Sequence, residues 1–196
     1  MSSALSCNGS RVLTPAEADA IRAVITKPSG RALFDALLYT GLRFSELRQV
    51  AAEPERFDEE RGTLAIKSTK PKAKYGARNV ILGTRGRDAV RRFLDLGAKM
   101  PNSATSWQMN LIRWAEQAGL SPLPGTTATG NPFGITVRTS RKTWESWLLA
   151  TCPERLIDII MSQGHSESVA IRHYVNLAWT GPEREAIRIE TGGWCR

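Results

Sequence analysis

The stretch Thr40-Gly41-Leu42-Arg43-Phe44-Ser45-Glu46-Leu47 places an arginine directly after a helix break. Gly41 interrupts the chain just before Arg43, and Ser45-Glu46-Leu47 continues as the start of a short helix. An arginine suits an anionic phosphodiester because its planar guanidinium is always charged and binds phosphate oxygens bidentately. Taken alone, however, an arginine at this point is most simply a surface residue at a helix start.

Two later segments carry groups of related chemistry. Arg138-Thr139-Ser140-Arg141-Lys142-Thr143 holds two arginines three residues apart, at the start of a strongly helical stretch. Gly164-His165-Ser166 is followed by Tyr174, nine residues after the histidine. A tyrosine hydroxyl has a pKa near 10, so it is a weak nucleophile without a nearby base and a field of positive charge.

The other histidine and tyrosines have simpler interpretations. A lone histidine is more often structural than catalytic, and His173 is interpreted in that way. Tyr39 lies on an apolar helix face, which indicates a core residue, and Tyr75 lies in a lysine-rich segment where it could contact DNA. Only Tyr174 stands at a fixed offset from a Gly-His-Ser sequence.

In this order and at these separations, the three segments resemble the tyrosine recombinase (phage integrase) family. The family pattern Thr-Gly-Leu-Arg-x-Ser-Glu-Leu is matched at all seven specified positions from Thr40 to Leu47. The resemblance implies that Arg43 and Arg141 clamp one DNA phosphate while Tyr174 attacks it. It also implies that Glu46 orients the Arg43 guanidinium, and that His165 accepts the phenol proton or donates to the phosphate.

The implied activity is that of a site-specific DNA recombinase or integrase of a mobile element, virus or plasmid. Strands would be cut and rejoined through a covalent 3′-phosphotyrosyl intermediate, in which arginine charge takes the place of a metal and the covalent bond takes the place of ATP. No cofactor is expected, and the sequence contains no HExxH motif, acidic metal cluster or glycine-rich phosphate loop.

Arg138 departs from the family pattern, which usually has a histidine three residues before the second arginine. An arginine can donate a hydrogen bond to a phosphate oxygen or a leaving group, but it cannot act as a base at neutral pH. We therefore include Arg138 among the candidate catalytic residues without a role in proton shuttling.

A lysine on a β-hairpin acts as the general acid in the family. Alignment with the end of the first strand selects Lys70, and Lys67 and Lys72 are alternatives. Lys67, Lys72 and Lys74 are otherwise expected to contact DNA phosphates or to be plain solvated charges.

Composition is consistent with this interpretation. The 196-residue chain has a formal net charge of +8, which favours double-stranded DNA as the partner because lysine and arginine gain from counterion release at phosphates. Its three cysteines are odd in number and lack a CxxC pair, so neither a disulfide framework nor a zinc site is expected. No apolar run approaches the roughly 18 residues of a membrane span. We expect a cytoplasmic, nucleoid-associated protein of a prokaryotic host.

Hydrophobic periodicity and turn residues predict a mainly α fold with one small antiparallel β-sheet (α+β), as in tyrosine recombinase catalytic domains. Thr14-Pro15 is expected to start the first helix. Further helices are expected over 31–39, 87–96, 107–118, 139–150, from Pro153, from Ser166 or Glu167 toward Tyr174, and over 180–190, with strands at 63–66 and 79–82.

The predicted organisation is a disordered leader over residues 1–11, a catalytic domain over 12–178 and a C-terminal helix and tail over 179–196. The tail has an apolar set that could dock on a neighbouring protomer or pack on its own domain: Ala186, Ile187, Ile189 and Trp194. Family members usually carry a preceding helical domain that clamps the other face of DNA, so the chain is expected to be a truncated or minimal recombinase. Self-association on DNA, from dimer to tetramer, is expected, with a monomer in isolation.

Three other functions compete with this interpretation. A non-catalytic DNA-binding module on the same fold would explain Arg138 as a mark of lost activity. A type IB topoisomerase shares the same residue logic, although the Gly-His-Ser to tyrosine spacing favours recombinases. A basic helical protein-interaction domain predicts no salt-dependent affinity for DNA.

Overall fold

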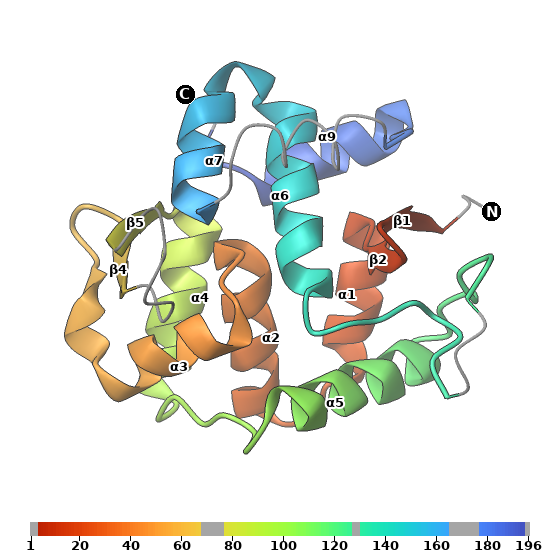
Figure 1. Cartoon of the computed structure of the whole chain (residues 1–196), viewed down its shortest axis with the longest axis horizontal. Helices are drawn as coiled ribbons and strands as arrows, with labels where there is room; N and C mark the ends of the chain where they lie inside the picture. Colours follow the sequence, from red (N-terminus) through yellow and green to blue (C-terminus); the bar gives the residue numbers. More distant parts are fainter. Residues whose placement is uncertain (1–3, 68–76, 127–129, 165–176, 195–196) are drawn as a thin grey trace.

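The computed structural model describes residues 4–67, 77–126, 130–164 and 177–194 (Figure 1). It is mainly helical with two small antiparallel sheets, which confirms the predicted fold class. The helices are α1 (Pro15–Val24), α2 (Pro28–Thr40), α3 (Phe44–Ala52), α4 (Thr84–Asp95), α5 (Ala104–Gln117), α6 (Thr139–Thr151), α7 (Leu156–Gln163) and α9 (Gly181–Glu190), with short 3-10 helices η1 (Pro54–Arg56) and η2 (Pro153–Arg155). The strands are β1 (Leu5–Cys7), β2 (Ser10–Val12), β3 (Phe57–Asp58), β4 (Thr63–Lys67) and β5 (Ala77–Ile81).

Helix α2 is the centre of the core. Every residue from Ala32 to Thr40 is buried, as expected for a helix that is covered on all sides, and α2 packs against α4 and α6. It begins at Pro28, three residues before the predicted start, because proline fits the first helical position. Because α2 is held on all sides, the position of its C-terminal end, and of Gly41 that follows, is fixed.

Gly41 ends α2 in a left-handed conformation with φ +63°. A Cβ at this position would lie 2.6 Å from Oε1 of Gln163 and 2.8 Å from Cδ1 of Trp144. Position 41 therefore requires glycine both for its backbone and for its packing. This tight turn sets Arg43 at the N-terminus of α3.

Strands β3, β4 and β5 form one antiparallel sheet beside α3, α4 and α7 (Figure 1). Leu64 pairs with Val80 and Ile66 with Arg78, and three of these four side chains are fully buried. The two predicted strands are confirmed with small shifts of their ends, whereas β3 was not predicted. The sheet brings the chain on either side of residues 68–76 close to α3.

The expected disordered leader is wrong for residues 5–11. Strands β1 and β2 form a hairpin in which Cys7 pairs with Ser10. Asn8 and Gly9 form its turn with φ +48° and +67°, which is the two-residue connection that suits the twist of a hairpin. Arg11 is fully buried: it forms an ion pair with Glu17 and donates to the carbonyl of Ser121 at 2.8 Å.

The C-terminal helix packs on its own chain. Ile187 and Trp194 are fully buried, and Glu190 accepts a hydrogen bond from the Tyr39 hydroxyl. Of the apolar residues considered for docking on a neighbour, only Ile189 is largely exposed. Burial of Tyr39 confirms its prediction as a core residue, and its ring meets that of Trp144 edge-on at 5.9 Å.

Three further features complete the description of the fold. Ser103 caps α5, and its hydroxyl accepts from the Ser106 amide at 3.0 Å. Cys152 is disulfide-bonded, so the expectation of no disulfide is wrong for it, while Cys7 is a buried thiol. None of the helices in the described ranges is long and apolar enough to cross a bilayer.

Candidate active site

Three of the predicted arginines face a single pocket. Arg43, Arg138 and Arg141 line a cavity of about 230 Å³ together with Phe44, Ser45, Ala104 and Val137. None of these described lining residues is acidic. The pocket is therefore positive in charge and open to an anionic ligand.

Two helix N-termini reinforce this charge. Arg43 stands at the N-cap of α3, and Arg138 at the N-cap of α6, with Arg141 in the first turn of α6. Free amides and the helix dipole make such ends favourable for anions. The side chain of Arg43 is 47% exposed and that of Arg141 only 5%, so one arginine can move to a ligand while the other is fixed.

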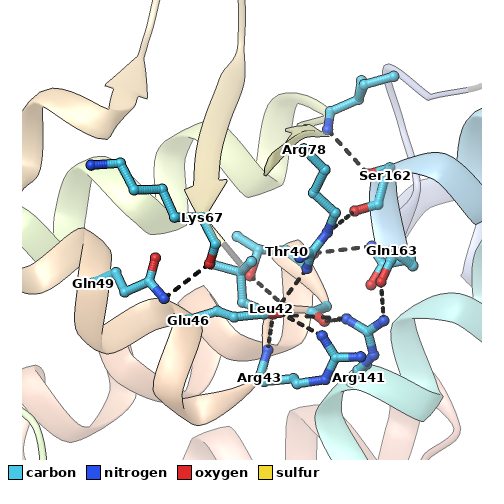
Figure 2. Close-up of polar contacts among 12 residues, drawn as sticks. Thr40, Leu42, Arg43, Glu46, Gln49, Lys67, Arg78, Arg141, Ser162 and Gln163 are labelled. Carbon is cyan, nitrogen blue, oxygen red and sulfur yellow. Dashed lines mark hydrogen bonds and ion pairs between the residues drawn. The ribbon is translucent and has the colours of Figure 1, made fainter. Parts of the chain in front are cut away.

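Glu46 is buried, and its carboxylate lies between Arg78 on one side and Arg43 and Arg141 on the other (Figure 2). Its Oε1 accepts from Nη1 of Arg43 at 2.5 Å, and its Oε2 accepts from the Arg43 amide at 2.8 Å and from Nη2 of Arg78 at 2.9 Å. Nη1 of Arg141 lies 4.0 Å from Oε2. One carboxylate thus reaches three guanidinium groups.

Burial alone would raise the pKa of Glu46. The hydrogen bond and charge of Arg78, followed by the amide and charge of Arg43, outweigh burial and lower this pKa to about 2. Glu46 is consequently a carboxylate at any physiological pH, and its hydrogen bonds to the arginines are charge-assisted.

Arg141 is held by the carbonyl ends of two helices. Its Nη1 donates to the Gly41 carbonyl at 2.8 Å, and its Nη2 donates to the carbonyl of Gln163 at the end of α7. Carbonyls at helix C-termini have no partner within their own helix, so they are natural acceptors for a buried cation. Burial, with the positive charge of Arg43, lowers the pKa of Arg141 to about 10, and the guanidinium is still charged at neutral pH.

The remaining predicted site residues are placed less completely. Lys67 is the exposed last residue of β4, and its carbonyl accepts from Nε2 of Gln49 at 3.2 Å. Figure 2 draws its amine directed away from the arginine pair. Lys70, Lys72, Lys74, His165 and Tyr174 lie outside the described residues.

Two residues of the site were missed from the sequence. Arg78 reaches Glu46 from β5, and the buried side chain of Gln163 donates to the Thr40 carbonyl at 3.2 Å. Arg78 lies two residues before the buried Val80 and so shares its face of β5, which places an arginine at an inward-facing position. An arginine on the inner face of a predicted strand was the sequence signal for this contact, because a buried charge needs a buried partner.

Among the described residues, no group of three or more His, Cys, Asp or Glu side chains is arranged to hold a metal ion.

Comparison with known proteins gives a match in structure. No protein-family model matches the sequence, and no curated protein matches it significantly. The crystal structure of XerA recombinase superimposes with a TM-score of 0.63 at 17% identity, over 91% of this chain. The integrase of transposon Tn1549, in complex with transposon right-end DNA, gives a TM-score of 0.64 at 18% identity, also over 91% of this chain.

The chain has the fold of a tyrosine recombinase catalytic domain. It spans 64% of the XerA structure and 65% of the Tn1549 integrase structure, so both proteins are longer. At these identities the likeness establishes the fold alone.

Proposed function

We propose that the protein cuts and rejoins double-stranded DNA as a tyrosine-type site-specific recombinase. The observation that carries the proposal is the convergence of Arg43 and Arg141 on one pocket, joined through Glu46, at the positions that the motif resemblance assigns to the phosphate clamp. Two adjacent positive charges suit the non-bridging oxygens of a phosphodiester, which gain negative charge during attack.

In the proposed reaction the Tyr174 oxygen attacks the scissile phosphorus, and the bond from phosphorus to the 5′-oxygen of the next nucleotide breaks. The phenol proton passes to His165, and Lys70 donates a proton to the leaving 5′-oxygen. The product is a 3′-phosphotyrosyl bond and a free 5′-hydroxyl. Attack by a 5′-hydroxyl from another strand reverses the step and completes strand exchange without an external energy source.

Arg138 lines the same pocket and is exposed, so it is available to a phosphate oxygen. It replaces the histidine usual in the family, and this difference favours the second candidate function, a DNA-binding module without cleavage. The presence of both clamp arginines and of Tyr174 weighs toward an active enzyme.

The proposed partner is double-stranded DNA, bound with the chain's net charge of +8 and the lysines around residues 67–74. The Tn1549 integrase structure contains transposon DNA, which supports this assignment by fold. Strand exchange joins two duplexes, so we further propose self-association on DNA. Such work on chromosomal or mobile-element DNA would place the protein at the nucleoid of a prokaryotic host.

Nicked duplexes that trap the covalent intermediate test the proposal. The native chain is incubated with a pool of mixed-sequence duplexes, and products are separated on a denaturing gel. A protein–DNA adduct that disappears in Tyr174→Phe and persists in Tyr75→Phe is the expected result. DNA binding without any adduct would favour the non-catalytic module, and topoisomerase activity would appear instead as relaxation of supercoiled plasmid.

A further inference from the structure

Arg78 occupies a position where an arginine is costly. It lies on β5 opposite Ile66, its side chain is only 13% exposed, and its neighbour on the same face, Val80, is fully buried. Removing a guanidinium from water is unfavourable unless partners replace the solvent. Arg78 must therefore be explained by what it contacts.

Its contacts join two other elements to the sheet (Figure 2). Nη2 donates to Oε2 of Glu46 on α3 at 2.9 Å, and Nε donates to the carbonyl of Ser162 on α7 at 2.9 Å. The Ser162 hydroxyl in turn accepts from the Ile81 amide of β5 at 3.1 Å. One guanidinium thus links α3, β5 and the C-terminal turn of α7.

Gly164 packs directly on Arg78. A Cβ on Gly164 would lie 3.0 Å from Cδ and 3.1 Å from Nε of Arg78, and the glycine has φ +67°. Gly164 immediately precedes His165 in the sequence, and β5 immediately follows the segment that contains Lys70. Arg78 consequently contacts both the helix that begins at Arg43 and the glycine that precedes His165 in the sequence.

Arg78 and Arg141 both approach the same carboxylate oxygen of Glu46. Oε2 of Glu46 accepts from Arg78 at 2.9 Å while Nη1 of Arg141 is 4.0 Å away. Without Arg78, this oxygen would be free to shorten its 4.0 Å ion pair with Arg141 and to draw the Arg141 guanidinium away from the pocket. Loss of Arg78 would also leave the cluster with one positive charge fewer near the phosphate site.

We propose that Arg78 is a positioning residue for strand cleavage, which holds the Glu46 carboxylate away from Arg141 and fixes the turn at Gly164. This inference rests on the proposed function. Arg78 lies outside the three motifs. Its proposed role is to fix the position of Glu46, and with it the arginine pair, relative to the turn at Gly164.

Arg78→Met and Arg78→Lys test the inference, with Arg56→Met as the matched control. Arg56 is as buried, binds the same sheet through the Ala65 carbonyl at 3.0 Å and pairs with Glu53 at 2.6 Å, away from the pocket.

In single-turnover reactions at saturating DNA, Arg78→Met is expected to slow adduct formation ~100-fold with little change in DNA affinity, as misplaced catalytic groups do. Arg78→Lys, which keeps the charge, is expected to recover part of the rate. Arg56→Met is expected to lower the melting temperature and keep the native rate.

A native rate in Arg78→Met would overturn the inference and leave the proposed function intact. Rates that fall equally in Arg78→Met and Arg56→Met would assign Arg78 to folding alone, and this too would overturn it. Absence of any Tyr174-dependent adduct from the native chain would reject the proposed function and the cleavage role together. Binding of inorganic phosphate, followed by thermal shift, then decides whether Arg78 positions the arginine pair: a weaker shift in Arg78→Met than in Arg56→Met supports positioning, and equal shifts reject it.

Discussion

Glu46 contacts Arg43 directly at 2.5 Å but lies 4.0 Å from Arg141, so this carboxylate holds the first arginine more closely than the second. The unequal distances matter because a phosphate clamp needs cations that are fixed but not neutralised. Two carbonyl groups, which carry no net charge, accept hydrogen bonds from the Arg141 guanidinium. The pocket thereby keeps its positive charge for a ligand.

Stability should depend on the ionisation of Glu46. Its pKa is lowered to about 2 from an ordinary 4.5, so its contribution is complete above pH 4.5 and is lost as the pH falls through about 2. A shift of this size corresponds to at most about 3 kcal/mol. Glu46→Gln is expected to lower the free energy of unfolding at pH 7 and to flatten its decline between pH 4.5 and 2, measured by urea titration.

The control for this measurement is Glu53→Gln. Glu53 also pairs with an arginine, but its side chain is 47% exposed, so solvent screens the pair. Equal flattening of the acid decline by both substitutions would contradict a special role for Glu46.

Inorganic phosphate should bind the arginine pocket and stabilise the fold. The mutual repulsion of Arg43 and Arg141 is relieved when an anion lies between them, and any ligand of the folded state raises its melting temperature. We expect phosphate to raise the melting temperature of the native chain more than sodium chloride of equal ionic strength does. Arg43→Ala should abolish the difference, because it removes the exposed cation of the pocket.

Arg61→Ala is the matched control, since Arg61 is an arginine with an 82% exposed side chain outside the pocket. If phosphate stabilised Arg43→Ala as well as the native chain, the anion would have to bind elsewhere.

DNA affinity should fall steeply with salt, with a slope to which the lysines after β4 contribute. Each phosphate contact removed lowers the slope of log K against log salt by about 0.9. Lys74→Ala is expected to reduce the slope by about this amount without altering adduct chemistry at low salt. Fluorescence anisotropy over a salt series measures it, and affinity that is independent of salt would support the protein-interaction alternative.

The sequence predicts the parts of the site whose signals are local. Arg43 and Glu46 share one turn of one helix, and Arg138 and Arg141 share another, so spacing alone sets each pair together. The asparagine–glycine pair at Asn8 and Gly9 was a local signal too, and the hairpin of residues 5–12 was missed because the apolar pattern around it is short.

Contacts created by tertiary packing were beyond such reasoning. Gln163 and Arg78 reach the site from α7 and β5, and only the folded chain shows that a glutamine carbonyl holds Arg141. The disulfide at Cys152 belongs to the same class, because cysteine number and spacing do not state which sulfurs become neighbours. The site depends on residues far apart in sequence that lie together at the ends of helices, and no local pattern predicts this.

Substitution of Arg138 should change the rate of cleavage without changing the stability of the fold. It lines the pocket and is exposed, whereas Arg141 is buried and satisfies two carbonyls. Arg138→Ala is expected to leave the melting temperature unchanged and to slow formation of the Tyr174 adduct by on the order of 100-fold or more, as loss of one oxyanion donor does. Arg138→His, which carries the residue usual in the family, should retain more of the rate than alanine. Arg141→Ala should lower the melting temperature as well as the rate, because it leaves the Gly41 carbonyl without its buried donor. Single-turnover kinetics and thermal melts of the three variants check this; a native rate in Arg138→Ala would remove Arg138 from the active site and assign phosphate binding to Arg43 and Arg141 alone.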